Sequence, residues 1–77
     1  MKDIKVLGSG CANCKTTTAL IEQVARDKGV AVNIDKIQDM QAIIAYGVLA
    51  TPGVVVDGKV VHAGGVPRRD RIEAWLA

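Results

Sequence analysis

The chain has 77 residues and a formal net charge of +2 at neutral pH, so it has room for one domain built around one hydrophobic core. Apolar residues make up 49% of the sequence but aromatic residues only 3%, so aliphatic side chains must fill that core. The mild charge and the scarcity of aromatic side chains argue against nucleic-acid binding. We therefore expect a single domain over residues 1–77.

The sequence contains no apolar segment of the length that crosses a membrane. The uncharged stretch over residues 42–56 is interrupted by polar residues, glycine and proline, and falls short of the roughly 20 apolar residues that a spanning helix needs. The first three residues lead directly into alternating residues and not into the apolar region of a signal peptide. We expect a cytoplasmic protein without a membrane partner, and a monomer is the simplest expectation.

The first half of the chain predicts a strand, a helix and a second strand. Ile4–Leu7 has the pattern of a short buried strand that ends at Gly8-Ser9-Gly10. Over residues 12–28 apolar side chains recur at helical spacing, and Gly29 is a favourable residue just beyond a helix end. Residues 30–35 then alternate between apolar and polar side chains, which predicts a strand.

A second, shorter helix is predicted to follow. Asp39 is a suitable N-cap, and the helix should stop near Gly47. Its apolar residues are expected to face inward and to belong to the core; they are Met40, Ile43 and Ile44.

The last third of the chain predicts a hairpin and a final helix. Val54–Val56 and Val60-Val61 flank Asp57-Gly58, a residue pair that suits the type I′ turn between antiparallel strands. Pro67 suits the first position of a helix. The apolar stripe of that helix is Ile72, Trp75 and Leu76.

The predicted order of elements is therefore β-α-β-α-β-β-α. A crossover through the first helix makes the first two strands parallel, and the hairpin adds an antiparallel pair. We expect an α/β fold in which a four-stranded mixed sheet is flanked by helices on both faces.

The two cysteines of the chain stand in Cys11-Ala12-Asn13-Cys14, where the first predicted strand turns into the first helix. The unpaired N–H groups and the positive dipole end of a helix stabilise a thiolate. Two thiols one helical turn apart can also close a disulfide. The arrangement favours reversible thiol–disulfide exchange, with Cys11 as the attacking thiol and the more buried Cys14 as the resolving thiol.

Neighbouring residues bear on this site. Gly8 and Gly10 are expected to let the backbone bend and to leave Cys11 accessible. Lys5 and Lys15 are candidate sources of positive field, although a solvated lysine is the simpler interpretation of each.

Other interpretations of the cysteine pair stay open. A purely structural disulfide would close a four-residue loop and stabilise the fold by only roughly 2 kcal/mol. Cys-x-x-Cys also occurs in zinc and copper sites, but the chain has no second such pair and a single histidine to complete a tetrahedral site. A metal-binding carrier and a redox-regulated adaptor are therefore the alternatives, and we expect neither a metal nor a cofactor.

A proline directly before the third predicted strand marks a second candidate feature of the site. Proline lacks an N–H and is normally excluded from strand interiors, so Pro52 at a strand start indicates a special backbone geometry. A cis bond between Thr51 and Pro52 would place an unpaired backbone edge beside Cys11, where a substrate peptide could pair. An ordinary trans proline is the alternative.

Three motifs together resemble those of the thioredoxin/glutaredoxin superfamily. They are Gly10-Cys11-Ala12-Asn13-Cys14, Thr51-Pro52-Gly53 before the hairpin, and Gly64-Gly65 before the last helix. Over essentially its whole length the chain is most similar to small thioredoxin-like redox-active disulfide proteins. The resemblance implies a thiol–disulfide oxidoreductase with a nucleophile at Cys11, a resolving thiol at Cys14 and a cis proline at Pro52.

The resemblance also implies substrate contacts and partners. The implied substrate-binding residues are Gly10, Ala12, Asn13, Thr51, Pro52, Gly64 and Gly65. The implied partners are a disulfide-containing protein or small molecule, and a reductase or low-molecular-weight thiol as electron donor. Thioredoxins have a tryptophan where Gly10 stands and an acidic residue where Lys5 stands, and the aromatic residue between the cysteines of glutaredoxins is missing. The electron donor and the redox potential are therefore left open.

Several other conspicuous residues are assigned ordinary structural roles. His62 is expected at the surface. Tyr46 is expected to pack the second helix, and the alternative for Tyr46 is that it shelters the disulfide. Trp75 and Met40 are expected in the core. A solvated face is expected for the basic cluster of the last helix, with anion or partner docking as the alternative; this cluster is Arg68, Arg69 and Arg71.

Overall fold

The computed structural model describes residues 1–8 and 12–77; Ser9, Gly10 and Cys11 lie outside the described residues. The elements in chain order are β1 (Lys2–Leu7), α1 (Ala12–Lys28), β2 (Val32–Ile37), α2 (Met40–Ala45), β3 (Gly53–Val56), β4 (Lys59–Ala63) and α3 (Arg69–Trp75). The predicted order β-α-β-α-β-β-α is confirmed.

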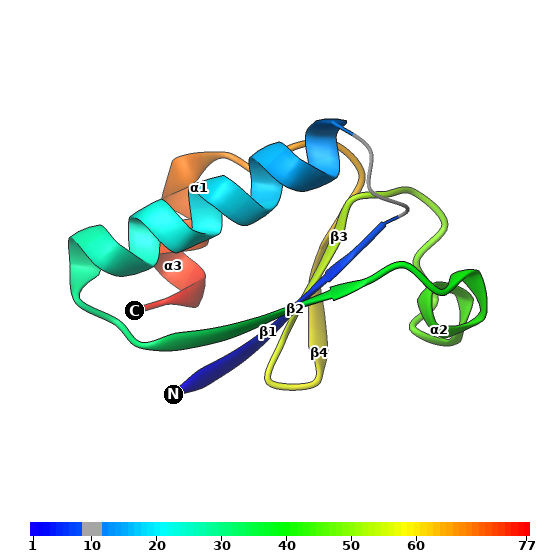
Figure 1. Ribbon diagram of the computed structural model, residues 1–77, viewed down its shortest axis with the longest axis horizontal. Coiled ribbons are helices and arrows are strands. Elements are labelled where there is room, and N and C mark those ends of the chain that lie inside the picture. The colour runs from blue at the N-terminus through cyan, green and yellow to red at the C-terminus, as the bar shows by residue number, and fades with distance from the viewer. Residues whose placement is uncertain (9–11) are drawn as a thin grey trace.

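The strands form one sheet in the order β2-β1-β3-β4. β1 runs parallel to β2 and antiparallel to β3, and β3 pairs with β4 in an antiparallel hairpin. The helices α1 and α3 lie on one face of the sheet, and α2 lies on the other (Figure 1). The mixed four-stranded sheet with helices on both faces is therefore as the sequence predicts.

Each face of the sheet carries its own hydrophobic cluster. Neighbouring residues of a strand point to opposite faces, so Val6 packs toward α1 and Leu7 toward α2. The cluster under α1 and α3 consists of Ile4, Val6, Ile21, Val24, Ala25, Val54, Ile72 and Leu76. The smaller cluster under α2 consists of Leu7, Ile43, Val48 and Val55.

The first turns of α1 contain three consecutive threonines, which are poor helix formers because of their branched side chains. Each hydroxyl donates to the backbone carbonyl oxygen four residues earlier: Thr16 at 3.0 Å, Thr17 at 2.8 Å and Thr18 at 3.0 Å. Thr17 and Thr18 are buried. The hydroxyl of Thr18 bonds the carbonyl of Cys14, so the turn that carries Cys14 is held by packing and by side-chain hydrogen bonds.

The second strand begins later than its alternation predicts. It spans Val32–Ile37 and not residues 30–35, and it pairs with β1 in register from Lys2–Val32 to Leu7–Ile37. The amide of Val30 donates to the carbonyl of Ala25 at 2.9 Å, which closes the end of α1. Residue 30 therefore belongs to the turn, although its side chain continues the apolar pattern.

The helix α2 has its predicted cap, but its predicted inner face is wrong in two positions. The Asp39 carboxylate accepts from the amide of Gln41 at 3.1 Å. Ile43 is buried, but Met40 is 61% exposed and Ile44 is 60% exposed. The helix has only six residues, so one side chain reaches the small cluster while its apolar neighbours remain in solvent.

The hairpin has its predicted turn. Asp57 and Gly58 both have positive φ angles, 50° and 84°, as a type I′ turn requires. A register irregularity lies between Val54 and Val55 in β3.

The last helix starts two residues after the position predicted from Pro67. Arg68 has extended backbone angles and is the N-cap, without a side-chain capping bond, so α3 begins at Arg69. Ile72 and Leu76 are buried as predicted, and Trp75 is partly buried against the same cluster. Packing, and not a capping side chain, therefore fixes this seven-residue helix.

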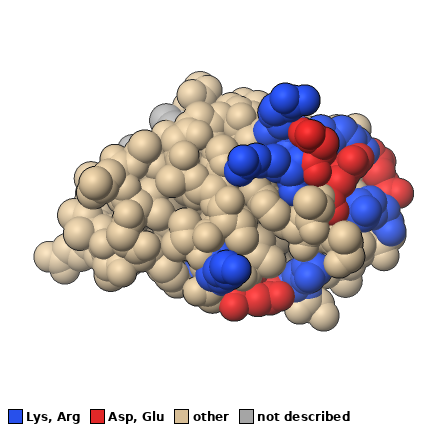
Figure 2. Space-filling model, turned by 180° about the vertical axis from the view of Figure 1, so that it is seen from behind, with Lys and Arg blue, Asp and Glu red and all other residues tan. Residues whose placement is uncertain are grey.

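Charged side chains are unevenly distributed. Seen from behind, they gather toward the end of the molecule that carries α3, and the end that carries α2 shows none (Figure 2). In the arginine cluster, Arg68 pairs with Asp70 at 3.3 Å, and Arg69 pairs with Glu73 at 3.1 Å and with Asp27 of α1 at 2.8 Å. Within the described ranges, no helix combines the length and apolar character of a membrane span.

Candidate active site

Cys14 lies on the first turn of α1 and is 6% exposed. The predicted nucleophile Cys11 and the predicted contact residue Gly10 lie outside the described residues. Ala12 and Asn13, also predicted as substrate contacts, are exposed on the same turn as Cys14. Cys14 is thus buried, and its role as the resolving thiol stays a prediction.

Gly8 packs directly against the sulfur of Cys14. A β-carbon at position 8 would overlap Cys14 Sγ and would lie 3.7 Å from Thr51 Cβ. The amide of Gly8 donates to the carbonyl of Ile37 at 2.9 Å, which holds the end of β1 beside β2. Sequence reasoning assigned Gly8 to a backbone bend. Gly8 does lie in a bend, and its missing side chain also makes room for the cysteine sulfur.

The Thr51–Pro52 segment, which precedes β3, also lies close to Gly8. The peptide bond between these residues is cis, the geometry that the family resemblance implies. Pro52 is buried, and Thr51 is exposed. Because Gly8 lies close to both Cys14 and Thr51, the end of β1, the first turn of α1 and the start of β3 meet at one site.

The diglycine lies beside the proline segment. Gly64 donates its amide to the carbonyl of Pro52 at 3.0 Å, and both glycines have positive φ angles, 86° for Gly64 and 71° for Gly65. His62 is half-buried: its Nε2 lies 2.9 Å from the carbonyl oxygen of Gly65, and its ring centroid lies 6.1 Å from that of Trp75. His62 is therefore partly exposed at the surface, as the sequence predicted, and it also supports the diglycine turn.

Two hollows flank this site. One, of about 70 Å³, lies between α1 and β2, and its lining includes Cys14, Lys15 and Lys36. The other, of about 270 Å³, lies along α2 and reaches Thr51; its wall includes Leu49, which is 93% exposed. Lys36 and Leu49 were missed by sequence reasoning, because nothing local in the sequence indicates that they border the cysteine turn.

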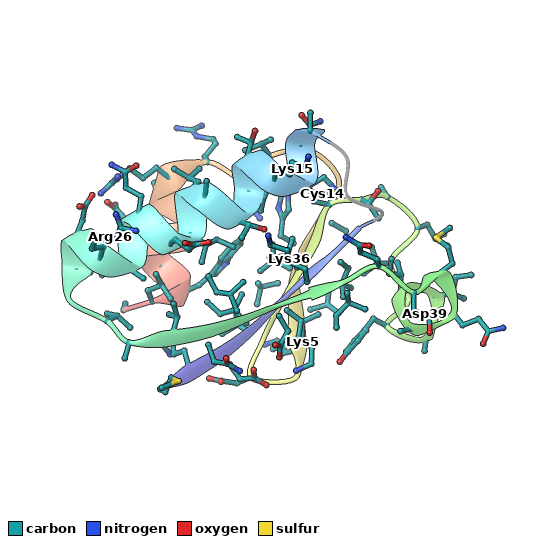
Figure 3. All side chains as sticks on the ribbon, viewed as in Figure 1. Lys5, Cys14, Lys15, Arg26, Lys36 and Asp39 are labelled. Atoms are coloured by element: carbon teal, nitrogen blue, oxygen red, sulfur yellow. The ribbon has the colours of Figure 1, made fainter. Side chains whose placement is uncertain are left out.

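Lys5 does not contribute to this site. It alternates with Val6, so its side chain is on the α2 face of the sheet, and Figure 3 shows it well away from Cys14. Its ammonium forms an ion pair with Asp3 at 3.0 Å. The hydrogen bond from Lys5 lowers the pKa of the Asp3 carboxyl, helped by the charge of Lys5 and by a hydrogen bond from Asn33. The hydrogen bond to Asp3 in turn raises the pKa of Lys5.

The lowered pKa of Asp3 makes stability depend on pH. The carboxylate stabilises the fold above the pKa of an unfolded aspartate, about 4, and that contribution is lost as the pH falls through the lowered folded-state pKa. We expect the advantage of the wild-type protein over Asp3→Asn in urea unfolding to be present at neutral pH and to disappear at acid pH. A difference that does not change with pH would contradict this role of the Asp3 charge.

The site includes no evident metal centre in the part of the chain that the structure describes, where no three His, Cys, Asp or Glu side chains converge.

Comparison with known proteins identifies the family. The sequence profile of the thioredoxin domain matches residues 2–77. The chain belongs to the thioredoxin domain family. A thioredoxin from Methanothermobacter thermautotrophicus is 31% identical over 77 residues, covering 100% of both chains. A thioredoxin from Methanocaldococcus jannaschii is 30% identical over 73 residues, covering 95% of this chain and 84% of that protein.

The fold has a matching relative among solved structures. The solution structure of reduced MJ0307 superimposes with a TM-score of 0.60 at 26% identity, covering 96% of this chain and 92% of that one. The superfamily and the fold expected from the three sequence motifs are thus confirmed. The protein is a thioredoxin-like redox protein of the oxidoreductase class.

Proposed function

We propose that this thioredoxin-family protein is a thiol–disulfide oxidoreductase that reduces disulfides through Cys11 and Cys14. The observation that carries the proposal is the position of Cys14, buried on the first turn of α1, against Gly8 and beside the Thr51–Pro52 segment. Cys11 precedes it by three residues in the sequence. A helix N-terminus favours the thiolate, which is the reactive form.

In the proposed reaction, the Cys11 thiolate attacks one sulfur of the substrate disulfide. The substrate S–S bond breaks, one half leaves as a thiolate, and a mixed disulfide forms on Cys11. Cys14 then gives up its proton and attacks the Cys11 sulfur, which releases the second half as a thiolate. Two electrons pass to the substrate, both product thiolates take up protons, and the protein is left with a Cys11–Cys14 disulfide.

The surroundings of Thr51 support a polypeptide as one class of substrate. Thr51 is exposed and borders the 270 Å³ hollow along α2, where the apolar side chains of Met40, Ile44 and Leu49 are exposed. An apolar side chain next to the substrate cysteine would bury surface there and gain about 25 cal/mol per Å². The substrate backbone would pair beside Thr51, with Ala12, Asn13, Gly64 and Gly65 as further contacts.

The oxidised protein must be returned to its dithiol form. We propose that a reductase or a low-molecular-weight thiol supplies the two electrons, and that the protein works as a monomer in the cytoplasm. Reduction is the expected direction, because cytoplasmic thiol pools keep exposed disulfides reduced.

Trapping of the intermediate tests the proposal. Cys14→Ser is expected to stop after the first step and to accumulate a mixed disulfide between Cys11 and a disulfide substrate. Non-reducing electrophoresis and mass spectrometry of the adduct, before and after dithiothreitol, would measure it. Cys11→Ser is the matched control and should neither trap the substrate nor turn it over. Equal trapping by the two variants would contradict the assigned roles.

A further inference from the structure

The hollow between α1 and β2 is lined by basic side chains next to the cysteine. It is lined by Cys14 and Gly8, by Lys15 of α1 and by Lys36 of β2; Cys14 and the two lysines are labelled in Figure 3. Lys15 and Lys36 also line an adjoining groove of about 390 Å³ that extends along α1 to Arg26. We call the two together the basic groove. It starts at the thiol and leads away from it along one helix.

The cations of the basic groove have no carboxylate partner among residues 1–8 and 12–77. The recorded ion pairs there involve Lys5, Arg68 and Arg69, and none involves Lys15, Lys36 or Arg26. Among the residues that the structure describes, Glu22 is the one carboxylate that lines the groove. Three cations and one carboxylate amount to a formal charge of +2, as large as the net charge of the whole chain.

Lys36 owes its place to the register of the sheet. It pairs with Val6, and it follows Val32 and Ile34 in the row of β2 residues that faces α1, both of which pack against the core. A third apolar residue would continue that row. A lysine there puts its charge at the edge of the sheet, beside the turn that carries Cys14.

We propose that the basic groove binds the anionic group of a low-molecular-weight disulfide substrate, such as a carboxylate or a phosphate. This inference rests on the proposed function and names a substrate class for it. An anion held between Lys15 and Lys36 lies next to Cys14, and Cys11 is three residues away in the sequence. The inner hollow of about 70 Å³ has room for a small charged group but not for a length of polypeptide.

The expected preference is modest but measurable. Ion pairs between exposed groups are weak, so two lysines together should favour an anionic disulfide over a neutral one by about three- to tenfold in rate. A cleft lined by one sign of charge also raises the local concentration of oppositely charged ligands. The preference should fall when the salt concentration rises, because exposed charges are screened.

Three aliphatic disulfides that differ in charge test the proposal. They are 3,3′-dithiodipropionate, which is anionic, 2-hydroxyethyl disulfide, which is neutral, and cystamine, which is cationic. The reduced full-length protein is mixed with each, and the rate of its oxidation is followed by mass spectrometry after thiol alkylation. The wild-type protein is expected to react fastest with the anionic disulfide and slowest with the cationic one.

Charge-neutralising variants test which lysines cause the preference for the anionic disulfide. The double variant Lys15→Gln/Lys36→Gln should lose most of the preference for the anionic disulfide, measured as the rate with the anionic disulfide divided by the rate with the neutral one. Lys28→Gln/Lys59→Gln removes the same charge at exposed positions outside the groove and should keep the preference.

The outcomes separate this inference from the proposed function. A protein that reacts with none of the three disulfides would contradict the proposed function itself. Equal rates with all three, or equal loss of preference in the two double variants, would leave the function intact and overturn the anion site. A fall of the neutral rate as large as that of the anionic rate would also overturn it, because the lysines would then act on the thiol. An acidic disulfide peptide that outcompetes dithiodipropionate would overturn the assignment to a small molecule.

Discussion

Gly8→Ala is expected to lower the free energy of unfolding by about 1–3 kcal/mol, the usual effect of an extra methyl group in a packed interior. The new β-carbon would overlap Cys14 Sγ, so the sulfur or the first turn of α1 has to move. Because displacement of a reacting group by about 1 Å can reduce a rate 10²-fold, we also expect turnover to fall by about tenfold or more. Urea unfolding and disulfide-reduction assays measure the two effects.

The same substitution in a Cys14→Ala background tests whether the contact with the Cys14 sulfur causes the loss of stability. In Cys14→Ala the sulfur is absent, and the methyl group of Gly8→Ala would fill part of the space that it leaves. The stability loss caused by Gly8→Ala should therefore be much smaller in the Cys14→Ala background, which a double-mutant cycle measures as a coupling energy. The same loss in both backgrounds would show that the backbone at position 8, and not the contact with Cys14, limits the side chain.

Ile72→Ala is expected to destabilise the protein by about 2–5 kcal/mol, as removal of a buried isoleucine side chain usually does. Ile72 is fully buried and joins α3 to the cluster beneath α1. A small domain has only about 5–15 kcal/mol of stability in all. The loss should be visible as a large shift of the urea midpoint, and Ile72→Val should shift it by much less.

An exposed isoleucine provides the matched control. Ile44 is 60% exposed on α2, so Ile44→Ala should change stability by less than about 0.5 kcal/mol. If Ile44→Ala were as destabilising as Ile72→Ala, α2 would have to be packed more deeply than the structure shows.

The sequence predicted the order and type of every element, because the signals for each agree with one another. Residues 12–28 have helical spacing and a terminal glycine, and Asp57-Gly58 stands between two valine-rich runs. The predictions of buried residues are wrong where an apolar pattern in the sequence is not matched by a tertiary contact. Met40 and Ile44 continue an apolar pattern, yet six helical residues can bury only one side chain in the small cluster.

The cysteine turn and the proline before β3 were also evident from the sequence, because their residue types alone indicate thiol chemistry and an unusual backbone. The sequence did not show that Gly8 makes room for Cys14 Sγ, nor that Lys36 borders the same thiol. Those relations join the end of β1, the first turn of α1 and the end of β2. These contacts depend on the pairing register of the strands and on the packing of α1 across the sheet.

Local residue order thus determined the order of the elements and the family of this protein, because turn signals, periodicity and short motifs act over a few residues. The tertiary structure decided what lies around the buried thiol and around Thr51: a glycine against the sulfur, a basic groove that starts beside the thiol and follows α1, and an apolar hollow that reaches Thr51 along α2. The physical reason is that contacts between segments distant in the chain depend on register and burial. No short stretch of sequence specifies either.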